Sequence, residues 1–108
     1  MTSFERGDVV IVDLGYAGKT RPCVVVSEHQ PDSQRAMAVV VPLTREARGG
    51  ECEVPFPKPA WLKQESVVNC VRIAGIDHAR IERRLAPFPA AAFHQIEQVL
   101  RNMLMIGQ

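Results

Sequence analysis

Three short apolar runs, rich in valine and interrupted by turn residues, constrain the fold of this chain most. They read DVVIVD at Asp8–Asp13, PCVVVS at Pro22–Ser27 and MAVVVPL at Met37–Leu43. β-Branched runs of this length, separated by polar or glycine-containing sequence, are typical of strands joined by turns. Because the second and third runs are almost continuously apolar, they predict central strands that are buried on both faces or closed into a barrel.

Further short segments extend the same pattern. Glu51–Pro55 alternates polar and apolar residues, and the proline-rich Phe56–Pro59 ends it, because proline cannot donate to a strand ladder. We expect this segment to be an edge strand or a connector. Ser66–Val71 and Arg80–Leu85 complete a set of strands separated by turn signals, which predicts an antiparallel sheet or a small barrel.

The last part of the chain predicts one amphipathic helix. From Pro89 onward, large apolar residues recur at helical spacing, while polar residues occupy the opposite face. Pro89 suits the first helical position, and Gly107 suits the stop. The predicted apolar face consists of Phe93, Ile96, Leu100, Met103 and Leu104. A lone helix has to cover a sheet with this face, so the predicted fold class is mostly β, α+β.

Length and composition bound the organisation of the chain. A chain of 108 residues, 46% of them hydrophobic, fits one domain, 1–108, with a core that needs no disulfide or metal. No apolar run approaches the roughly 18 residues of a membrane span, so we expect no integral membrane protein. Charged residues near the N-terminus stand where a secretion signal would need an apolar stretch, so we expect a cytoplasmic location.

Cysteine and charge counts exclude two classes of site. Cys23, Cys52 and Cys70 form no close pair, which argues against a disulfide framework or a four-ligand zinc site and predicts reduced core thiols. Thirteen basic and twelve acidic residues give a net charge of +1, unlike the strongly basic surface of a protein that coats nucleic acid. Ten of the basic residues are arginines, whose planar fork can hold phosphate in a small basic site.

Few single residues carry chemistry by themselves. Arg21 stands where a loop enters a buried strand and Thr44 at the exit of another, so each could contact a phosphate. A solvated arginine and a turn-capping threonine are the simpler interpretations. The sequence has no metal-binding, phosphate-loop or serine-hydrolase motif. A lone histidine is more often a surface residue than a general base, and the sequence has three, His29, His78 and His94. Residues 82–84, Glu-Arg-Arg, are expected to be a solvated strand end.

Read in order, several blocks form a recognisable combination: RGDVVIVDL at 6–14, RPCVVVS at 21–27, VPLT at 41–44, ESVV at 65–68, then Ile76-Asp77 and the final helix. This combination resembles the MazF/PemK family of toxin ribonucleases over nearly the whole chain. The resemblance implies an SH3-like small barrel of the CcdB/PemK type with a C-terminal amphipathic helix, usually as a homodimer. It also implies a toxin that cuts single-stranded RNA at short sequences without a metal or other cofactor. An antitoxin with an acidic, flexible segment would neutralise it.

The resemblance further implies roles for individual residues. Arg21 and Thr44 correspond to the family's two catalytic positions. Metal-free RNA cleavage uses the ribose 2′-hydroxyl to attack its own phosphate, and a fixed guanidinium and a hydroxyl would stabilise the charge that builds on the phosphate oxygens. Arginine stays protonated, so we do not expect it to be the base. The RNA-binding positions implied are Lys19, Thr20, Glu51, Asn69 and Arg72, and Glu51 or a histidine is a candidate acid or base.

Two departures from the family pattern leave alternatives open. The loop 15–20 is short, and residues 71–75 read VRIAG where the family often reads DQIRT, so Arg72 is new while an acid and an arginine are missing. One alternative is a CcdB-like gyrase poison, but that class depends on a tryptophan near the C-terminus, and the only tryptophan here is Trp61. The other is a binding module or a degenerate toxin that only binds antitoxin or RNA.

Overall fold

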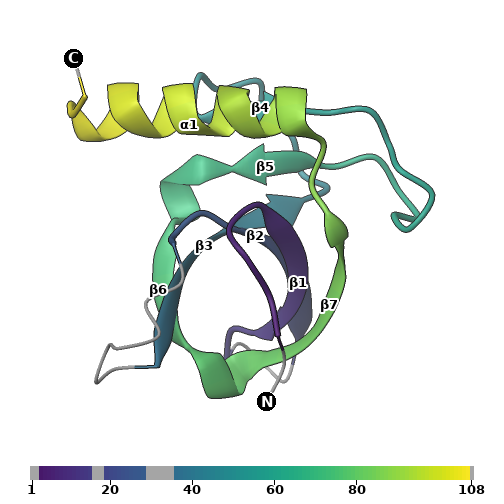
Figure 1. Ribbon diagram of the computed structural model, residues 1–108. Coiled ribbons are helices and arrows are strands. Elements are labelled where there is room, and N and C mark those ends of the chain that lie inside the picture. Colours follow the sequence, from purple (N-terminus) through teal and green to yellow (C-terminus); the bar gives the residue numbers. More distant parts are fainter. Residues whose placement is uncertain (1–2, 16–18, 29–35, 108) are drawn as a thin grey trace.

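Strands and a C-terminal helix make up most of the computed structural model, which describes residues 3–15, 19–28 and 36–107 (Figure 1). The strands are β1 (Asp8–Asp13), β2 (Thr20–Val25), β3 (Met37–Thr44), β4 (Glu53–Pro55), β5 (Val67–Asn69), β6 (Ala74–Asp77) and β7 (Ile81–Pro87). Two short 3-10 helices, η1 (Cys70–Arg72) and η2 (His78–Arg80), flank β6, and α1 (Ala90–Leu104) follows β7.

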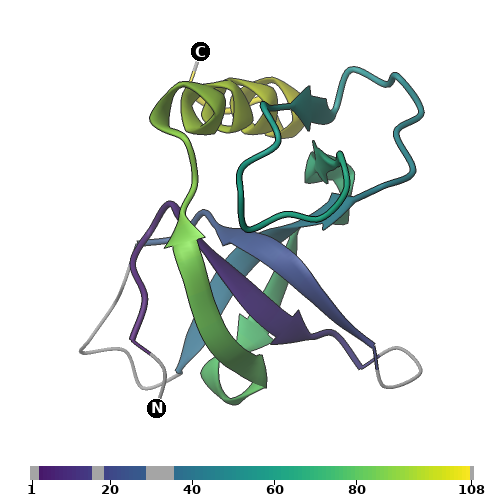
Figure 2. The ribbon, with the colours of Figure 1, turned by 90° about the vertical axis from the view of Figure 1, so that its right-hand side faces the viewer.

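The strands form an antiparallel sheet that curls into a ring. Their order is β4-β5-β3-β2-β1-β7, and β6 also pairs with β3. Figure 1 looks along the ring formed by β1, β2, β3, β6 and β7, and Figure 2 shows the same strands from the side. β2 and β3 lie at the centre and β4 at an edge. The mostly β fold with one C-terminal helix, predicted from the sequence, is therefore confirmed.

The valine-rich runs are buried on both faces of this sheet, as predicted. Neighbouring residues belong to different core clusters: Val9 and Val24 to one, Val10 and Val25 to the other. The cluster with Val10 and Val25, the inner cluster, has all its buried residues on ring strands and fills the inside of the ring. The cluster with Val9 and Val24, the outer cluster, includes residues of β4, β5 and α1 and lies outside the ring. Because both faces of β1, β2 and β3 meet apolar neighbours, these strands need near-continuous apolar sequence.

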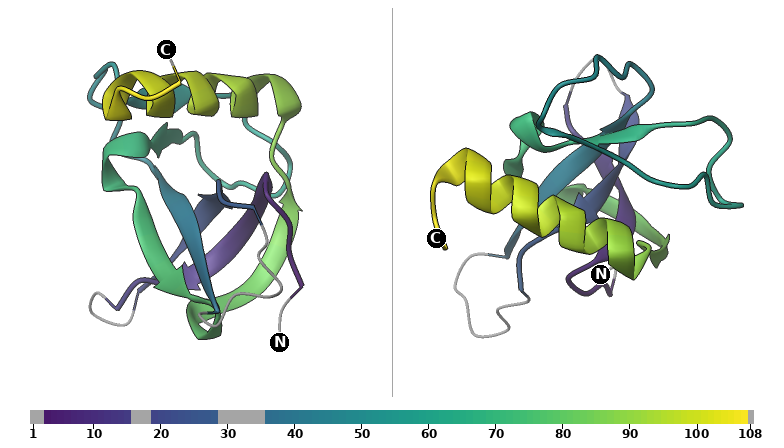
Figure 3. Two further views of the ribbon diagram at one scale, coloured as in Figure 1. Left: turned by 60° about the vertical axis from the view of Figure 1, so that its left-hand side comes forward. Right: turned by 90° about the horizontal axis from the view of Figure 1, so that it is seen from above.

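α1 lies along the outside of the ring, next to β4 (Figure 3). Ala92 and Ile96 are its buried residues, and Phe93, Leu100 and Met103 pack partly buried against the outer cluster. Leu104 is 48% exposed, so its assignment to the apolar face is wrong. It lies in the last turn of the helix, where the chain turns away after Met103 has made the final apolar contact.

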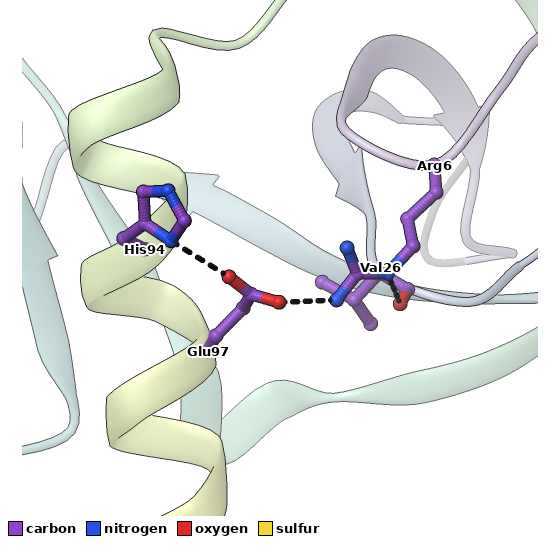
Figure 4. A network of polar contacts seen from close by, with 4 residues as sticks. All are labelled: Arg6, Val26, His94 and Glu97. Atoms are coloured by element: carbon purple, nitrogen blue, oxygen red, sulfur yellow. Dashed lines mark hydrogen bonds and ion pairs between the residues drawn. The ribbon is translucent and has the colours of Figure 1, made fainter.

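One arginine near the N-terminus fastens the helix to the ring (Figure 4). The Arg6 guanidinium donates to the Glu97 carboxylate at 2.7 Å and to the carbonyl oxygen of Val26 at 3.1 Å. Its carbon Cζ also lies 4.7 Å from the centre of the Phe93 ring. His94 contacts the other carboxylate oxygen of Glu97 at 3.1 Å. Arg6 thus joins the end of β2 to the first turns of α1 by charge, hydrogen bonding and ring contact.

Several strand boundaries differ from the sequence prediction; for example, β4 begins at Glu53 and not Glu51, and β7 extends to Pro87 and not Leu85. β2 begins at Thr20, earlier than predicted, because its pairing with β1 continues to Asp13. The predicted strand 66–71 ends at Asn69, where the chain tightens into η1. β6 is not predicted by the sequence pattern, because its four residues, AGID, begin with two weak strand formers and become a strand through pairing with β3.

The helix ends also differ from the prediction. Pro89 is the N-cap and not the first helical residue, and its carbonyl oxygen accepts from the Phe93 N–H at 2.9 Å. At the other end, Met105 and not Gly107 takes the left-handed conformation that ends the helix, with a φ of 58°. This conformation lets the N–H groups of Met105 and Ile106 donate to helix carbonyls.

The three cysteines are free, as predicted. Cys23 and Cys70 are fully buried, and burial raises the pKa of Cys23 to about 12 and of Cys70 to about 11. Cys52 is half-buried, so it is only partly a core residue. Within the described residues, the structure contains no helix with the length and apolar character needed to cross a membrane.

Candidate active-site groove

A groove of about 370 Å³ opens on the outer face of the curled sheet. Strand residues and the connection between β4 and β5 line it. The strand residues are Ile11, Thr20, Arg21, Pro22, Leu43, Arg83 and Leu85, and the others are Arg45, Trp61, Leu62, Lys63, Gln64 and Ser66.

The groove exists because α1 covers only part of the outer sheet face. Across β1, β2 and β3, the residues Val9, Val24 and Val41 form one row and are fully buried in the outer cluster. Two residues further along, Ile11 pairs with Pro22, and both are only half-buried and line the groove. The same sheet face is therefore core at one end and groove floor at the other.

The strands also separate at the groove. The pairing of β2 with β3 ends at Cys23 and Pro42, while β3 turns to pair with β5 through Leu43 and Thr44. The first residues of β2 continue to pair with β1 alone. This separation leaves open space beside Leu43, and residues 61–64 and 66 form another wall.

That wall is held by polar contacts. The Arg45 guanidinium donates to the side-chain oxygen of Gln64 at 2.8 Å, which ties the segment after β3 to the segment before β5. The Ser66 hydroxyl donates to the Gln64 carbonyl oxygen at 3.4 Å. Trp61 and Leu62 pack against the outer cluster, so the wall has an apolar side as well.

The charge of the groove has one sign. Its described lining residues include four cations, Arg21, Arg45, Lys63 and Arg83, and no aspartate or glutamate. The whole chain has a net charge of only +1, so the positive charge is concentrated here by folding. An apolar floor with a cationic rim favours an anionic ligand that also carries flat apolar groups, and single-stranded nucleic acid has this chemistry.

Only one of the two predicted catalytic residues lines the groove. Arg21 is exposed, lines the groove and pairs with Val12. Thr44 ends β3 and is half-buried; it follows the groove residue Leu43 but does not line the groove itself. Cys23 and Pro42, the last pair between β2 and β3, stand two residues from Arg21 and Thr44 respectively. The Thr44 hydroxyl oxygen accepts from the Glu46 N–H at 3.1 Å, so it caps the turn while its own proton remains available to a ligand.

The structure divides the predicted RNA-binding residues into two groups. Lys19 is exposed just before β2, and Thr20 begins β2 and lines the groove. Glu51 is exposed in the turn before β4, Asn69 ends β5, and Arg72 is exposed at the end of η1. β5 leads away from Ser66, which lines the groove. Glu51, Asn69 and Arg72 therefore lie at the other end of β5, and none of them lines the groove.

The sequence-based prediction assigned no role to the other three cations of the groove, Arg45, Lys63 and Arg83, or to its aromatic residue, Trp61. Residues 82–84 are exposed, as predicted, but they lie within β7 and not at its end. Arg84 donates two hydrogen bonds to the buried Asp8 carboxylate, at 2.8 and 3.2 Å. This ion pair and hydrogen bonding raise the pKa of Arg84. Alternation along a strand separates the two arginines, but only the topology shows which one meets the groove.

The described histidines lie outside the groove lining. His94 contacts Glu97 on α1, and the His78 ring meets the Phe4 ring edge to face at 5.1 Å. His29 lies outside the described residues. Among the described residues, no three His, Cys, Asp or Glu side chains gather as they would around a metal ion.

Comparison with known proteins places the chain in a family. The profile described as "PemK-like, MazF-like toxin of type II toxin-antitoxin system" matches residues 5–104. The fold is similar to that of an endoribonuclease solved in complex with its cognate antitoxin from a Mycobacterial species, with a TM-score of 0.82, 24% identity and coverage of 98% of this chain and 99% of that chain. The Mycobacterium tuberculosis toxin MazF-mt6 has a TM-score of 0.80 and 23% identity, with coverage of 94% of this chain and 99% of that chain. A MazE-MazF structure (Form-II) from Deinococcus radiodurans has a TM-score of 0.78 and 25% identity, with coverage of 96% of this chain and 97% of that chain. Since the profile spans nearly the whole chain, this protein belongs to the family of PemK-like, MazF-like toxins of type II toxin–antitoxin systems.

Proposed function

We propose that this toxin is an endoribonuclease that cuts single-stranded RNA at short sequences without a metal ion, and that the groove is where the RNA binds. The observation that carries the proposal is the cationic groove, with four positive side chains and no acidic one among its described lining residues. Such a groove follows a phosphate backbone, and the apolar floor of Ile11, Leu43 and Leu85 accommodates bases. The family assignment supports the same activity.

The cleavage proposed here is an internal transfer of the phosphate. The 2′-oxygen of a ribose attacks the neighbouring phosphorus as its proton leaves, the bond from phosphorus to the 5′-oxygen breaks, and that oxygen takes up a proton. The products are a 2′,3′-cyclic phosphate and a 5′-hydroxyl. Arg21 would stabilise the charge on the non-bridging oxygens, and the Thr44 hydroxyl would donate to one of them.

Neither proton-transfer residue is assigned by this geometry. Glu51 lies at the far end of β4 and β5 from the groove, and the described histidines do not line the groove. A guanidinium group has five N–H donors and no acceptor, so Arg21 serves as a hydrogen-bond donor. We therefore propose Arg21 and Thr44 as the residues that stabilise the transition state, and Lys19 and Thr20 as RNA contacts beside them.

The test is incubation of the purified protein with a long single-stranded RNA in excess EDTA, with mapping of the cut sites and of the new ends. We expect cuts at a short recurring sequence that leave 5′-hydroxyl ends. Arg21→Ala should reduce the rate about 100-fold or more, the usual loss when a preorganised donor is removed. Arg101→Ala is the matched control, because Arg101 is exposed on α1 and away from the groove.

A second pair of variants tests Thr44. Thr44→Val removes the hydroxyl at nearly constant volume, and Thr44→Ser retains it; we expect the first to lose activity and the second to keep most of it. If a folded protein cuts none of a wide range of RNAs, the activity proposal is refuted. A toxin that acts by binding would then be favoured, and growth arrest would persist in Arg21→Ala.

We also propose two protein partners. The first is a cognate antitoxin whose acidic, flexible segment folds onto the cationic groove, since opposite charge complements it. Related structures have been solved with an antitoxin, which supports this partner. The second is another copy of the chain, because Leu104, Met105 and Ile106 expose an apolar surface at the end of α1. Light scattering that finds only monomer at micromolar concentration would refute the homodimer.

A further inference from the structure

The groove contains the only tryptophan of the sequence, Trp61. This residue is half-buried, packs against the outer core cluster and also lines the groove. Part of its surface is therefore fixed by the core while another part faces the groove. A large aromatic ring held in this way is a rigid surface for a flat ligand.

The surroundings of Trp61 indicate what that ligand is. Lys63 stands two residues away on the same wall, Arg45 is held at this wall by Gln64, and Arg83 lines the groove from β7. A single strand of RNA presents phosphates and bases alternately, so cations and an aromatic face side by side match its repeat. Stacking on an aromatic side chain is a general way in which proteins hold an unpaired base.

We propose that Trp61 is the surface on which one nucleobase of the bound RNA stacks, and that it fixes where the strand lies in the groove. This proposal rests on the proposed function, since it takes single-stranded RNA as the ligand. Because every base has an aromatic face, Trp61 positions the strand without selecting its sequence. It is a substrate-binding residue, and Arg21 and Thr44 remain the residues that act on the phosphate.

A purely structural tryptophan is the competing explanation. The wall has other supports, however: Leu62 also packs against the core, its N–H donates to the Pro59 carbonyl oxygen at 3.1 Å, and Arg45 holds Gln64. Loss of the indole should therefore leave the wall in place. This allows the binding role to be measured in a folded protein.

The first experiment uses the unmodified protein, because its fluorescence comes from one tryptophan. The probe is a single-stranded oligonucleotide of 2′-O-methyl RNA about eight nucleotides long, within the usual site size for such grooves, and it cannot be cut because its 2′-oxygens are blocked. We expect saturable quenching of Trp61 fluorescence. An abasic oligonucleotide with the same number of phosphates should bind with much less quenching.

The second experiment compares Trp61→Phe with Trp61→Leu. Phenylalanine retains an aromatic face, whereas leucine retains only apolar packing. We expect leucine to weaken binding of the 2′-O-methyl oligonucleotide about tenfold or more, and phenylalanine to weaken it less. For cleavable RNA, KM should rise in Trp61→Leu while kcat changes little. Thermal unfolding of both variants shows whether the fold is retained.

The outcomes separate this proposal from the proposed function. If the oligonucleotide binds by anisotropy and RNA is cut, but Trp61 is not quenched and Trp61→Leu binds normally, the stacking role is overturned and the endoribonuclease remains. If the abasic oligonucleotide quenches Trp61 as strongly as the oligonucleotide with bases, the ring senses charge or a loop movement, and the stacking role is again overturned. If neither binding nor cleavage occurs, both proposals fail.

Discussion

Replacement of Ile96 by alanine tests how α1 is attached to the ring. Ile96 is fully buried and is the largest of the fully buried side chains, with Val9, Val24 and Val41 in the same cluster. The change removes its packing and leaves a cavity that the surrounding strands can fill only in part. Substitutions of this kind lower the free energy of unfolding by about 2–5 kcal/mol, and we expect a value of about 3–4 kcal/mol at this central position.

The expected loss is large compared with the whole free energy of unfolding of such a domain. A domain of this size is stable by about 5–15 kcal/mol, and each 1 kcal/mol shifts the melting temperature by roughly 4–8 °C. Ile96→Ala should therefore melt roughly 12–32 °C below the parent protein. The assay is urea denaturation followed by circular dichroism, with melting curves recorded in parallel. Ile96→Ala and its control are best prepared in an Arg21→Ala background, which also serves as the parent protein, so that toxicity does not limit expression.

Leu104→Ala is the matched control on the same helix. Both residues belong to the apolar face predicted from the sequence, but Leu104 is 48% exposed and leaves no cavity when shortened. Measured at a concentration low enough for the monomer, its loss should cost less than about 1 kcal/mol, because only part of the burial of a leucine side chain is removed. Equal losses for Ile96→Ala and Leu104→Ala would refute the reasoning, since they would mean that the end of α1 is as deeply packed as its middle.

Two further predictions concern titratable groups. The hydrogen bond and charge of Arg6 lower the pKa of Glu97 below its ordinary value of 4.5, so this contact stabilises the fold above that value and is lost as the pH falls through the lowered pKa. The free energy of unfolding should therefore fall more steeply below pH 4.5 in the parent protein than in Glu97→Gln, and parallel pH profiles would contradict this. Iodoacetamide at pH near 8 should modify Cys52 first, because burial raises the pKa of Cys23 to about 12 and of Cys70 to about 11; mass spectrometry of partially modified protein shows the order, and fast modification of Cys23 in the folded state would oppose it.

The sequence was most informative where burial and chain periodicity agree. The three valine-rich runs predicted central strands because both sheet faces are covered, and the structure confirms this through the two core clusters. The segment 51–55 was predicted as an edge strand or a connector, and its residues 53–55 form β4 at the edge of the sheet. β6 could not be predicted, because its AGID sequence becomes a strand only through the open edge of β3.

The candidate site shows the same limit. Arg21 and Thr44 were predicted as catalytic residues because they lie in sequence blocks that resemble the MazF/PemK family; in the structure Arg21 lines the groove and Thr44 follows the groove residue Leu43. Arg45, Lys63 and Arg83 carry no comparable local signal. They come from separate segments, and their cations belong to one site only after β7 has paired with β1 and the segment 61–66 has packed against the core.

The sequence by itself determined the strand runs, the single amphipathic helix and the absence of a strongly basic composition, because these depend on local spacing and on counts. The tertiary structure alone decided that α1 covers the row of Val9, Val24 and Val41 and leaves the next row, with Ile11 and Pro22, uncovered. It also decided that Arg83 turns to the groove while Arg84 meets Asp8. Which face of a strand is covered depends on the partners that folding brings from distant parts of the chain, and alternation within the strand cannot specify those partners.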